Sequence, residues 1–185
     1  LVHNGDLWFG SLGQGLFKFH QGQLYNLDSE QGLLSNLVFM LSVDTKNRIW
    51  ASSEVGLNVV SEQVKIIQTF DRTNGLKNDA IWSLVYDQQG SVWLGTSGGL
   101  IRINTSDFSY ETYVKADGTQ GLEYNFGAVW LAPDGRVFIG GSQGFNQFYP
   151  NTIAAHLQPA NIVLTEISIL GKTISPTHNN ALISV

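Results

Sequence analysis

Apolar residues occur in short runs along the chain, and residues typical of turns separate one run from the next. Between residues 38 and 70 this pattern predicts four strands, over 38–43, 48–53, 56–61 and 64–70, with Asp44-Thr45-Lys46-Asn47 as the first turn. The following stretch repeats the pattern over 81–86, 92–96, 100–104 and 109–115. The three- and four-residue spacing of a helical repeat is missing. The pattern therefore indicates antiparallel strands in groups of four, called A to D in chain order.

An aromatic residue recurs in strand B at intervals of 42, 43 and 45 residues, at Trp8, Trp50, Trp93 and Phe138. A glycine and an apolar residue follow each time, at Gly15-Leu16, Gly56-Leu57, Gly99-Leu100 and Gly144-Phe145. A second marker keeps the same period, at Gly32-Leu33, Gly75-Leu76 and Gly121-Leu122. Four antiparallel strands in a period of about 40–50 residues form the blade of a β-propeller. We therefore predict an all-β fold of about four four-stranded blades, a fragment of a larger propeller.

The predicted domains follow from where the repeat stops. Residues 1–150 are propeller blades, with repeats at about 1–31, 32–74, 75–120 and 121–150. The first blade begins inside its strand A, and the last shows strands A to C without a clear strand D. Residues 151–159 form a polar linker, and residues 160–185 begin a separate β-sandwich, cut short at Val185.

The direction of the strands divides the loops between two rims. The D–A loops, near 32–36, 75–79 and 121–125, share one rim with the B–C loops, near 53–56, 96–99 and 141–144. The A–B turns lie on the opposite rim. Because propellers usually bind ligands over the mouth of the central channel, the first rim is the place to look for a site.

Polar residues gather on this first rim, from the starts of strand A and one B–C loop: Asn36, Glu54, Asn78, Asp79, Glu123, Tyr124 and Asn125. Amides, carboxylates and a phenol can hydrogen-bond a polar ligand such as a saccharide. The asparagines can instead cap turns by bonding to the backbone, and their recurrence in every blade favours capping. The neighbours that vary from blade to blade are then the better candidates for ligand specificity.

Two other repeated features have a structural and a functional interpretation. The strand B aromatics either stack on sugars or pack between blades, and their equivalence in every blade favours packing. The A–B turns carry Asp44, Asp87 and Asp134. Each turn supplies one carboxylate without the alternating aspartates of a calcium loop, so we expect turn formation and no metal site.

Composition excludes several functions. The chain has no cysteine, so it has no disulfide or thiolate chemistry. Its net charge of −5 argues against nucleic-acid binding, no run approaches the roughly 18 apolar residues of a membrane span, and no cofactor motif is present. The histidines at positions 3, 20, 156 and 178 lie off the predicted rim. We therefore expect a segment that is not an enzyme.

The unit from Asn74 to Leu100 resembles the two-component regulator propeller repeat, and the unit from Gly121 to Pro150 resembles the final blade of such arrays. In that family a triple-tyrosine immunoglobulin-like domain follows, and residues 160–174 fit its first strands. Ala51-Ser52 departs from the motif, which more often has Ile-Gly or Leu-Gly there. The resemblance implies the periplasmic sensor region of a membrane receptor, whose output is a histidine kinase, often a hybrid one, or a diguanylate cyclase.

Together these features predict a ligand-sensing propeller segment of a two-component-type receptor, which binds a polar small molecule or oligosaccharide and relays the signal. A catalytic propeller, such as a lyase or hydrolase, and a protein-binding scaffold are the alternatives. The expected partners are the remaining blades of the parent propeller or a second copy of the chain.

Overall fold

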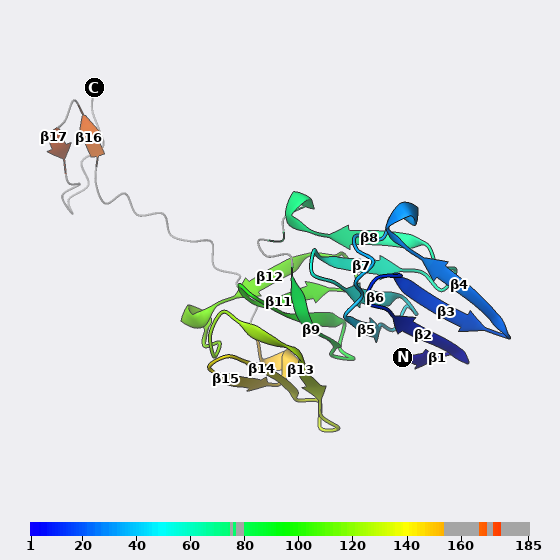
Figure 1. Cartoon of the computed structure of the whole chain (residues 1–185). Coiled ribbons are helices and arrows are strands. Elements are labelled where there is room, and N and C mark those ends of the chain that lie inside the picture. The colour runs from blue at the N-terminus through cyan, green and yellow to red at the C-terminus, as the bar shows by residue number, and fades with distance from the viewer. Residues whose placement is uncertain (75, 77–79, 154–166, 170–171, 175–185) are drawn as a thin grey trace. The chain divides into compact units, whose positions relative to one another are not determined.

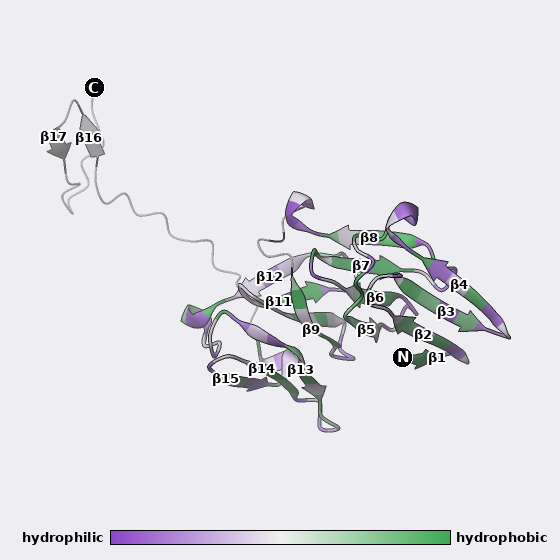
Figure 2. Cartoon of the chain, in the orientation of Figure 1, coloured by the Kyte–Doolittle hydropathy of each residue, from purple (hydrophilic) through white to green (hydrophobic). Residues whose placement is uncertain are grey.

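The computed structural model of the chain describes residues 1–74, 76, 80–153, 167–169 and 172–174, in two units, Leu1–Ala155 and His156–Val185 (Figure 1). The described part contains short 3-10 helices and no α-helix. Apolar residues concentrate in the strands and hydrophilic ones in the connecting loops (Figure 2). None of the described residues lies in a helix long and apolar enough to span a membrane.

Four antiparallel sheets follow one another along the first unit, each with its strands in chain order. Blade 1 contains β1 (Val2–His3), β2 (Asp6–Gly10), β3 (Leu16–His20) and β4 (Gln23–Leu27). Blade 2 contains β5 (Met40–Val43), β6 (Ile49–Ser52), β7 (Leu57–Val60) and β8 (Ile66–Phe70). Blade 3 contains β9 (Ile81–Tyr86), β10 (Ser91–Thr96), β11 (Gly99–Asn104) and β12 (Tyr110–Tyr113). Blade 4 contains β13 (Tyr124–Leu131), β14 (Val137–Gly141) and β15 (Gly144–Phe148).

These sheets confirm the predicted all-β fold of four-stranded antiparallel blades. In blades 2 and 3 each strand begins and ends within two residues of its predicted bounds. The inner strands of blades 2, 3 and 4 contact one another, as strands around a propeller axis do.

The strand B aromatics of blades 1, 2 and 3 pack toward the next blade. Trp8, Trp50 and Trp93 are fully buried. Trp8 clusters with Val38 and Ile49 of blade 2. Because large rings fill the space between adjacent sheets, they supply much of the apolar area that each blade interface buries.

A cation lies against each of these rings, at 5.3 to 5.8 Å from the ring centroid. In blades 2 and 4 the cation comes from the start of strand B, as Arg48 and Arg136. In blades 1 and 3 it comes from strand C, as Lys18 and Arg102. Every ring therefore has a cation–π contact, although its source alternates between two positions of the repeat.

The loops divide between two rims as strand direction predicted. The loop rim carries the D–A and B–C loops, described over 11–15, 28–39, 53–56, 97–98, 114–123 and 142–143. The amides of Gly13 and Gly15 there donate to the carbonyl oxygen of Asn36, at 2.9 Å each. The turn rim carries the A–B and C–D turns: 4–5, 21–22, 44–48, 61–65, 87–90, 105–109 and 132–136. On this rim Nε2 of His3 lies 3.1 Å from Oδ1 of Asn47 in the next blade.

The structure corrects the second marker in the last repeat. The 3-10 helices η1 (Ser29–Gln31) and η3 (Lys115–Asp117) end at Gly32 and Gly118, both left-handed, with φ of 101° and 92°. After them Leu33 and Thr119 are buried, at 3% and 8% exposure, whereas Leu122 is 48% exposed. The counterpart of Gly32-Leu33 is therefore Gly118-Thr119 and not Gly121-Leu122.

The first unit ends in the 3-10 helix η4 (Pro150–Thr152), and the described part of the second unit is the hairpin of β16 (Ile167–Ile169) and β17 (Lys172–Ile174). Ile167 pairs with Ile174 and Ile169 with Lys172. The predicted boundaries at residues 150 and 160 and the immunoglobulin-like assignment stay predictions.

Candidate ligand-binding site on the loop rim

Three aromatic side chains meet at the loop-rim ends of the inner strands. Phe39 lies directly before β5, Trp82 is in β9 and Phe126 is in β13. Phe39 stacks on Trp82 with ring centroids 5.5 Å apart and an interplanar angle of 12°, and it meets Phe126 edge-on, also at 5.5 Å. We call these residues the axial aromatic cluster. Since blades 2 and 4 are not adjacent, their rings can only meet on the inner side of the propeller.

The axial aromatic cluster is accessible. Phe126 is 60% exposed, and the rings of Phe39 and Trp82 are half-buried. Phe126 lies in the irregular part of β13, where the register with β14 shifts between Tyr124 and Val129. Such an interruption re-aims a side chain out of the regular sheet. An exposed aromatic surface among polar loops is a suitable platform for the apolar face of a ligand.

Sequence reasoning missed this cluster, although a signal for it was present. The three aromatics lie 43 and 44 residues apart, in phase with the strand B aromatics. In the sequence these aromatics look like core residues. They differ because strand A is the innermost strand of each blade, and that arrangement exists only once the blades have assembled.

Glu54 is the most constrained polar residue on the loop rim. Its Oε1 accepts a hydrogen bond from the Ser35 hydroxyl at 2.6 Å. Its Oε2 is inaccessible to solvent and has no partner among the described residues. A buried carboxylate oxygen without a donor is costly, so the Glu54 carboxylate would gain by turning its Oε2 toward a donor brought by a ligand.

The Asn36 side chain serves the backbone. Its Oδ1 accepts from the Ser29 amide at 2.8 Å, which fixes the D–A loop ahead of blade 2. This contact is the capping role that the recurrence of asparagine favoured. Asn78 and Asp79 lie outside the described residues.

Tyr124 differs from the expectation of an accessible rim phenol. It is 3% exposed and packs with Trp93 in the core between blades 3 and 4. Its hydroxyl donates to Asn146 at 2.8 Å, and burial raises its pKa to about 12. The cause is Gly95, where a Cβ atom would lie 2.7 Å from that of Tyr124, so the glycine lets the ring enter the interface. Tyr124 therefore belongs to the core.

Glu123 and Asn125 flank Tyr124 and point outward, since both are exposed. Their backbones are fixed: the carbonyl of Glu123 accepts from the Ser142 amide at 3.1 Å, and that of Asn125 accepts from the Ser83 hydroxyl at 2.7 Å. Asn125 directly precedes Phe126 in β13.

The turn-rim aspartates have a role that the sequence did not reveal. Asp44 and Asp87 are buried, and each accepts from the indole nitrogen of its own blade, Trp50 at 2.9 Å and Trp93 at 3.0 Å. Blade 4 has Phe138, which offers no N–H, and its Asp134 is exposed and pairs with Arg136 instead. Among the described residues, no group of three or more histidines and acidic residues could hold a metal ion.

Comparisons with known proteins agree with this architecture. Residues 75–98 match the family model described as "Two component regulator propeller". Histidine kinase P4 from Formosa agariphila is 22% identical over 233 residues, which cover 96% of this chain and 17% of that protein. The chain therefore spans only about a sixth of this relative.

Two solved structures share the fold. The extracellular domain of a putative hybrid two component system from B. thetaiotaomicron has a TM-score of 0.65 at 18% identity, over 80% of this chain and 21% of that one. Virginiamycin B lyase from Staphylococcus aureus has a TM-score of 0.58 at 13% identity, over 82% of this chain and 54% of that one. The chain is thus a run of β-propeller blades that contains a two component regulator propeller repeat.

Proposed function

We propose that this chain is part of the extracytoplasmic, periplasmic sensor region of a two-component-type membrane receptor. It binds a polar ligand such as a saccharide and relays binding to an output module, a histidine kinase or a diguanylate cyclase. The propeller repeat in residues 75–98 and the similarity to a histidine kinase support this assignment. The segment itself is not catalytic, and the described loop rim carries no histidine to act as a base.

The observation that carries the ligand-binding part is the axial aromatic cluster. Rings from blades 2, 3 and 4 present an accessible apolar surface at the propeller axis, with the exposed Asn125 next in sequence to Phe126. Sugars combine apolar C–H faces with hydroxyl groups, so a site for them needs both a ring and polar partners. The unpaired Oε2 of Glu54 becomes a second acceptor on the same rim when the side chain turns outward.

The same geometry supplies a route for signalling. A ligand on the axial aromatic cluster contacts rings of blades that are not adjacent, so binding favours one arrangement of blades 2 and 4. A ligand shifts a conformational equilibrium by its difference in affinity for the two states. The change in the blades is then passed along the chain toward the membrane.

The proposed partners follow from the outer faces of the end blades. Leu7, Phe9 and Phe19 are exposed on blade 1, and Trp130 and Phe145 are exposed on blade 4. Apolar sheet faces of this kind are covered in stable assemblies. We propose that further blades of the parent propeller cover them, or a second copy of the chain.

The test is calorimetric titration of the chain with neutral oligosaccharides of glucose, xylose, mannose and arabinose. We expect one or more to bind, with Phe126→Ala weakening binding about tenfold or more and Glu54→Gln weakening it less. Phe145→Ala is the matched control, since it removes an equally exposed phenylalanine of blade 4 away from the axis. Equal losses in Phe126→Ala and Phe145→Ala, or no binding by any of these sugars, would refute the site.

A further inference from the structure

A second hollow opens on the turn rim, between blades 1 and 2. It has a volume of about 480 Å³, which is within the range of small-molecule sites. Blade 1 lines it with Asp6, Lys18, His20 and Tyr25, and the C–D turn of blade 2 lines it with Glu62 and Val64. We call it the turn-rim pocket. It is on the opposite rim from the axial aromatic cluster.

Hydrogen bonds hold the polar wall of this pocket in place. The Asp6 carboxylate accepts from Lys18 Nζ at 2.8 Å and contacts His20 Nδ1. Lys18 also donates to the backbone oxygen of Glu62 at 2.7 Å, which ties the two blades together. With Nδ1 directed at Asp6, a neutral His20 carries its proton there and offers Nε2 as an acceptor. The wall is therefore organised before any ligand binds.

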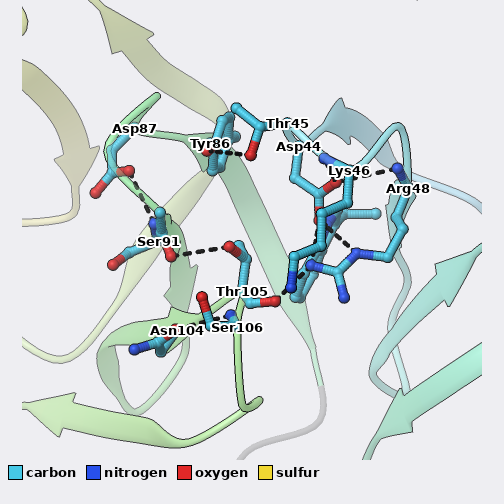
Figure 3. A network of polar contacts seen from close by, with 12 residues as sticks. Asp44, Thr45, Lys46, Arg48, Tyr86, Asp87, Ser91, Asn104, Thr105 and Ser106 are labelled. Carbon is cyan, nitrogen blue, oxygen red and sulfur yellow. Dashed lines mark hydrogen bonds and ion pairs between the residues drawn. The ribbon is translucent and has the colours of Figure 1, made fainter.

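The next blade interface shows what a filled version of this site looks like. Val64 and Phe108 occupy the same place in the C–D turns of blades 2 and 3. Each is the residue before the last one of its turn, and each has a left-handed φ, of 61° and 63° respectively. Phe108 packs against Trp50 with ring centroids 6.0 Å apart, and the Arg48 guanidinium lies 4.9 Å from the Phe108 ring. Arg48 also donates to the Thr105 carbonyl and pairs with Asp44 (Figure 3).

At this interface Val64 lines the pocket, in the place where the larger Phe108 packs on Trp50 at the next interface. Blade 1 also lacks the bond between aspartate and indole. Trp8 Nε1 is buried without a partner among the described residues, whereas Trp50 bonds to Asp44. The strand register places His3 where blade 2 has Asp44, and Asp6 where it has Arg48.

The lining selects for a ligand with hydroxyl groups. An anion would lie beside the carboxylates of Asp6 and Glu62, and a cation would lie beside the Lys18 ammonium. Hydroxyl groups both donate and accept, so they can satisfy Lys18, Glu62 and His20 together. The Tyr25 ring, 42% exposed, supplies an apolar surface at the edge. We propose that the turn-rim pocket binds a small neutral polyhydroxylated molecule, such as a single sugar unit.

The experiment follows the imidazole signals of His20 and the methyl signals of Val64 by ¹H–¹³C NMR while glucose, galactose, xylose or arabinose is added to the chain. We expect saturable shifts at both residues with at least one sugar. Val64→Phe, which copies Phe108, should abolish the His20 shift, and Glu62→Gln should weaken binding about tenfold while keeping the shape of the pocket. If Val64→Phe does not fold, Glu62→Gln alone decides.

Phe126→Ala separates this proposal from the loop-rim site, since it leaves the turn-rim pocket intact and should leave the His20 shift unchanged. The proposal is overturned if no sugar produces saturable shifts at His20 and Val64, or if the shifts persist in Glu62→Gln at unchanged affinity. Sulfate or ethylammonium shifting these signals at lower concentration than every sugar would also overturn it, because the pocket would then select charge.

Discussion

The buried aspartate of blade 3 allows a sharp test of how each blade is held together. Asp87 Oδ1 accepts from the amides of Gln89 and Ser91 at 2.8 and 2.9 Å, and its Oδ2 accepts from Trp93 Nε1 at 3.0 Å. Both of its oxygens therefore accept hydrogen bonds. We predict that Asp87→Asn, which keeps the shape and removes the charge, destabilises the chain substantially.

The magnitude follows from the geometry. Asparagine has one oxygen, and if that oxygen serves the two backbone amides, its NH₂ group faces the indole N–H of Trp93. One charge-assisted hydrogen bond is then lost and two buried donors face each other, at a cost of about 2–4 kcal/mol. In blade 4 the register places Ala132 where blade 3 has Asp87, and Asp134 of the same turn is exposed and pairs with Arg136. Asp134→Asn should therefore cause a much smaller loss.

The assay is urea unfolding followed by far-UV circular dichroism, for the wild type, both aspartate variants, Trp93→Phe and the double variant Asp87→Asn/Trp93→Phe. Trp93→Phe removes the indole donor, so Asp87→Asn should cost less in that background, with a coupling energy of about 1–2 kcal/mol. A loss in Asp87→Asn no greater than in Asp134→Asn would refute this reasoning. An equal loss from Asp87→Asn with Trp93 and with Phe at position 93 would also refute it.

Three further predictions concern other contacts. Gly95→Ala places a Cβ atom 2.7 Å from that of Tyr124, and we expect a loss of about 1–3 kcal/mol in the same urea assay. The pKa values of Tyr113 and Tyr124 are raised to about 12, chiefly by burial, so both phenols should stay protonated until the pH passes 10. Because their folded pKa values exceed the unfolded value of 10.0, the stability they support should fall between pH 10 and 12, which absorbance at 295 nm and unfolding midpoints would show. The pKa of Asp6 is lowered, chiefly by the hydrogen bond from Lys18, so its stabilising effect is present above pH 3.8 and is lost as the pH falls below it. Lys18→Met should raise the pKa of this carboxyl, measured by carboxyl ¹³C NMR.

Strands and their repeat could be predicted from the sequence because their signal is local. The strand predicted at 81–86 is β9, since alternation and β-branched residues specify an extended segment without reference to its neighbours. The burial of Trp8, Trp50 and Trp93 followed from the same periodicity, because a residue repeated in every blade serves the contact that every blade makes.

The register of the loops could not be read in the same way. Gly121-Leu122 resembles Gly32-Leu33 as a pair of letters, yet Gly118 ends the 3-10 helix of that loop. Backbone hydrogen bonds and the left-handed φ of the terminating glycine decide the equivalence, and neither depends on the dipeptide alone. Asn36 and Asn125 likewise look equivalent in the sequence, but they occupy different positions in the structure.

The sequence by itself determined the blade, its period and the residues that pack one sheet on the next. Tertiary structure alone decided the two sites. Phe39 and Phe126 are 87 residues apart and meet because the inner strands converge on one axis. The turn-rim pocket joins Lys18 of blade 1 to Glu62 of blade 2, 44 residues further along the chain. Strand patterns arise from neighbouring residues, whereas the space between blades depends on the sizes of side chains that the sequence keeps far apart.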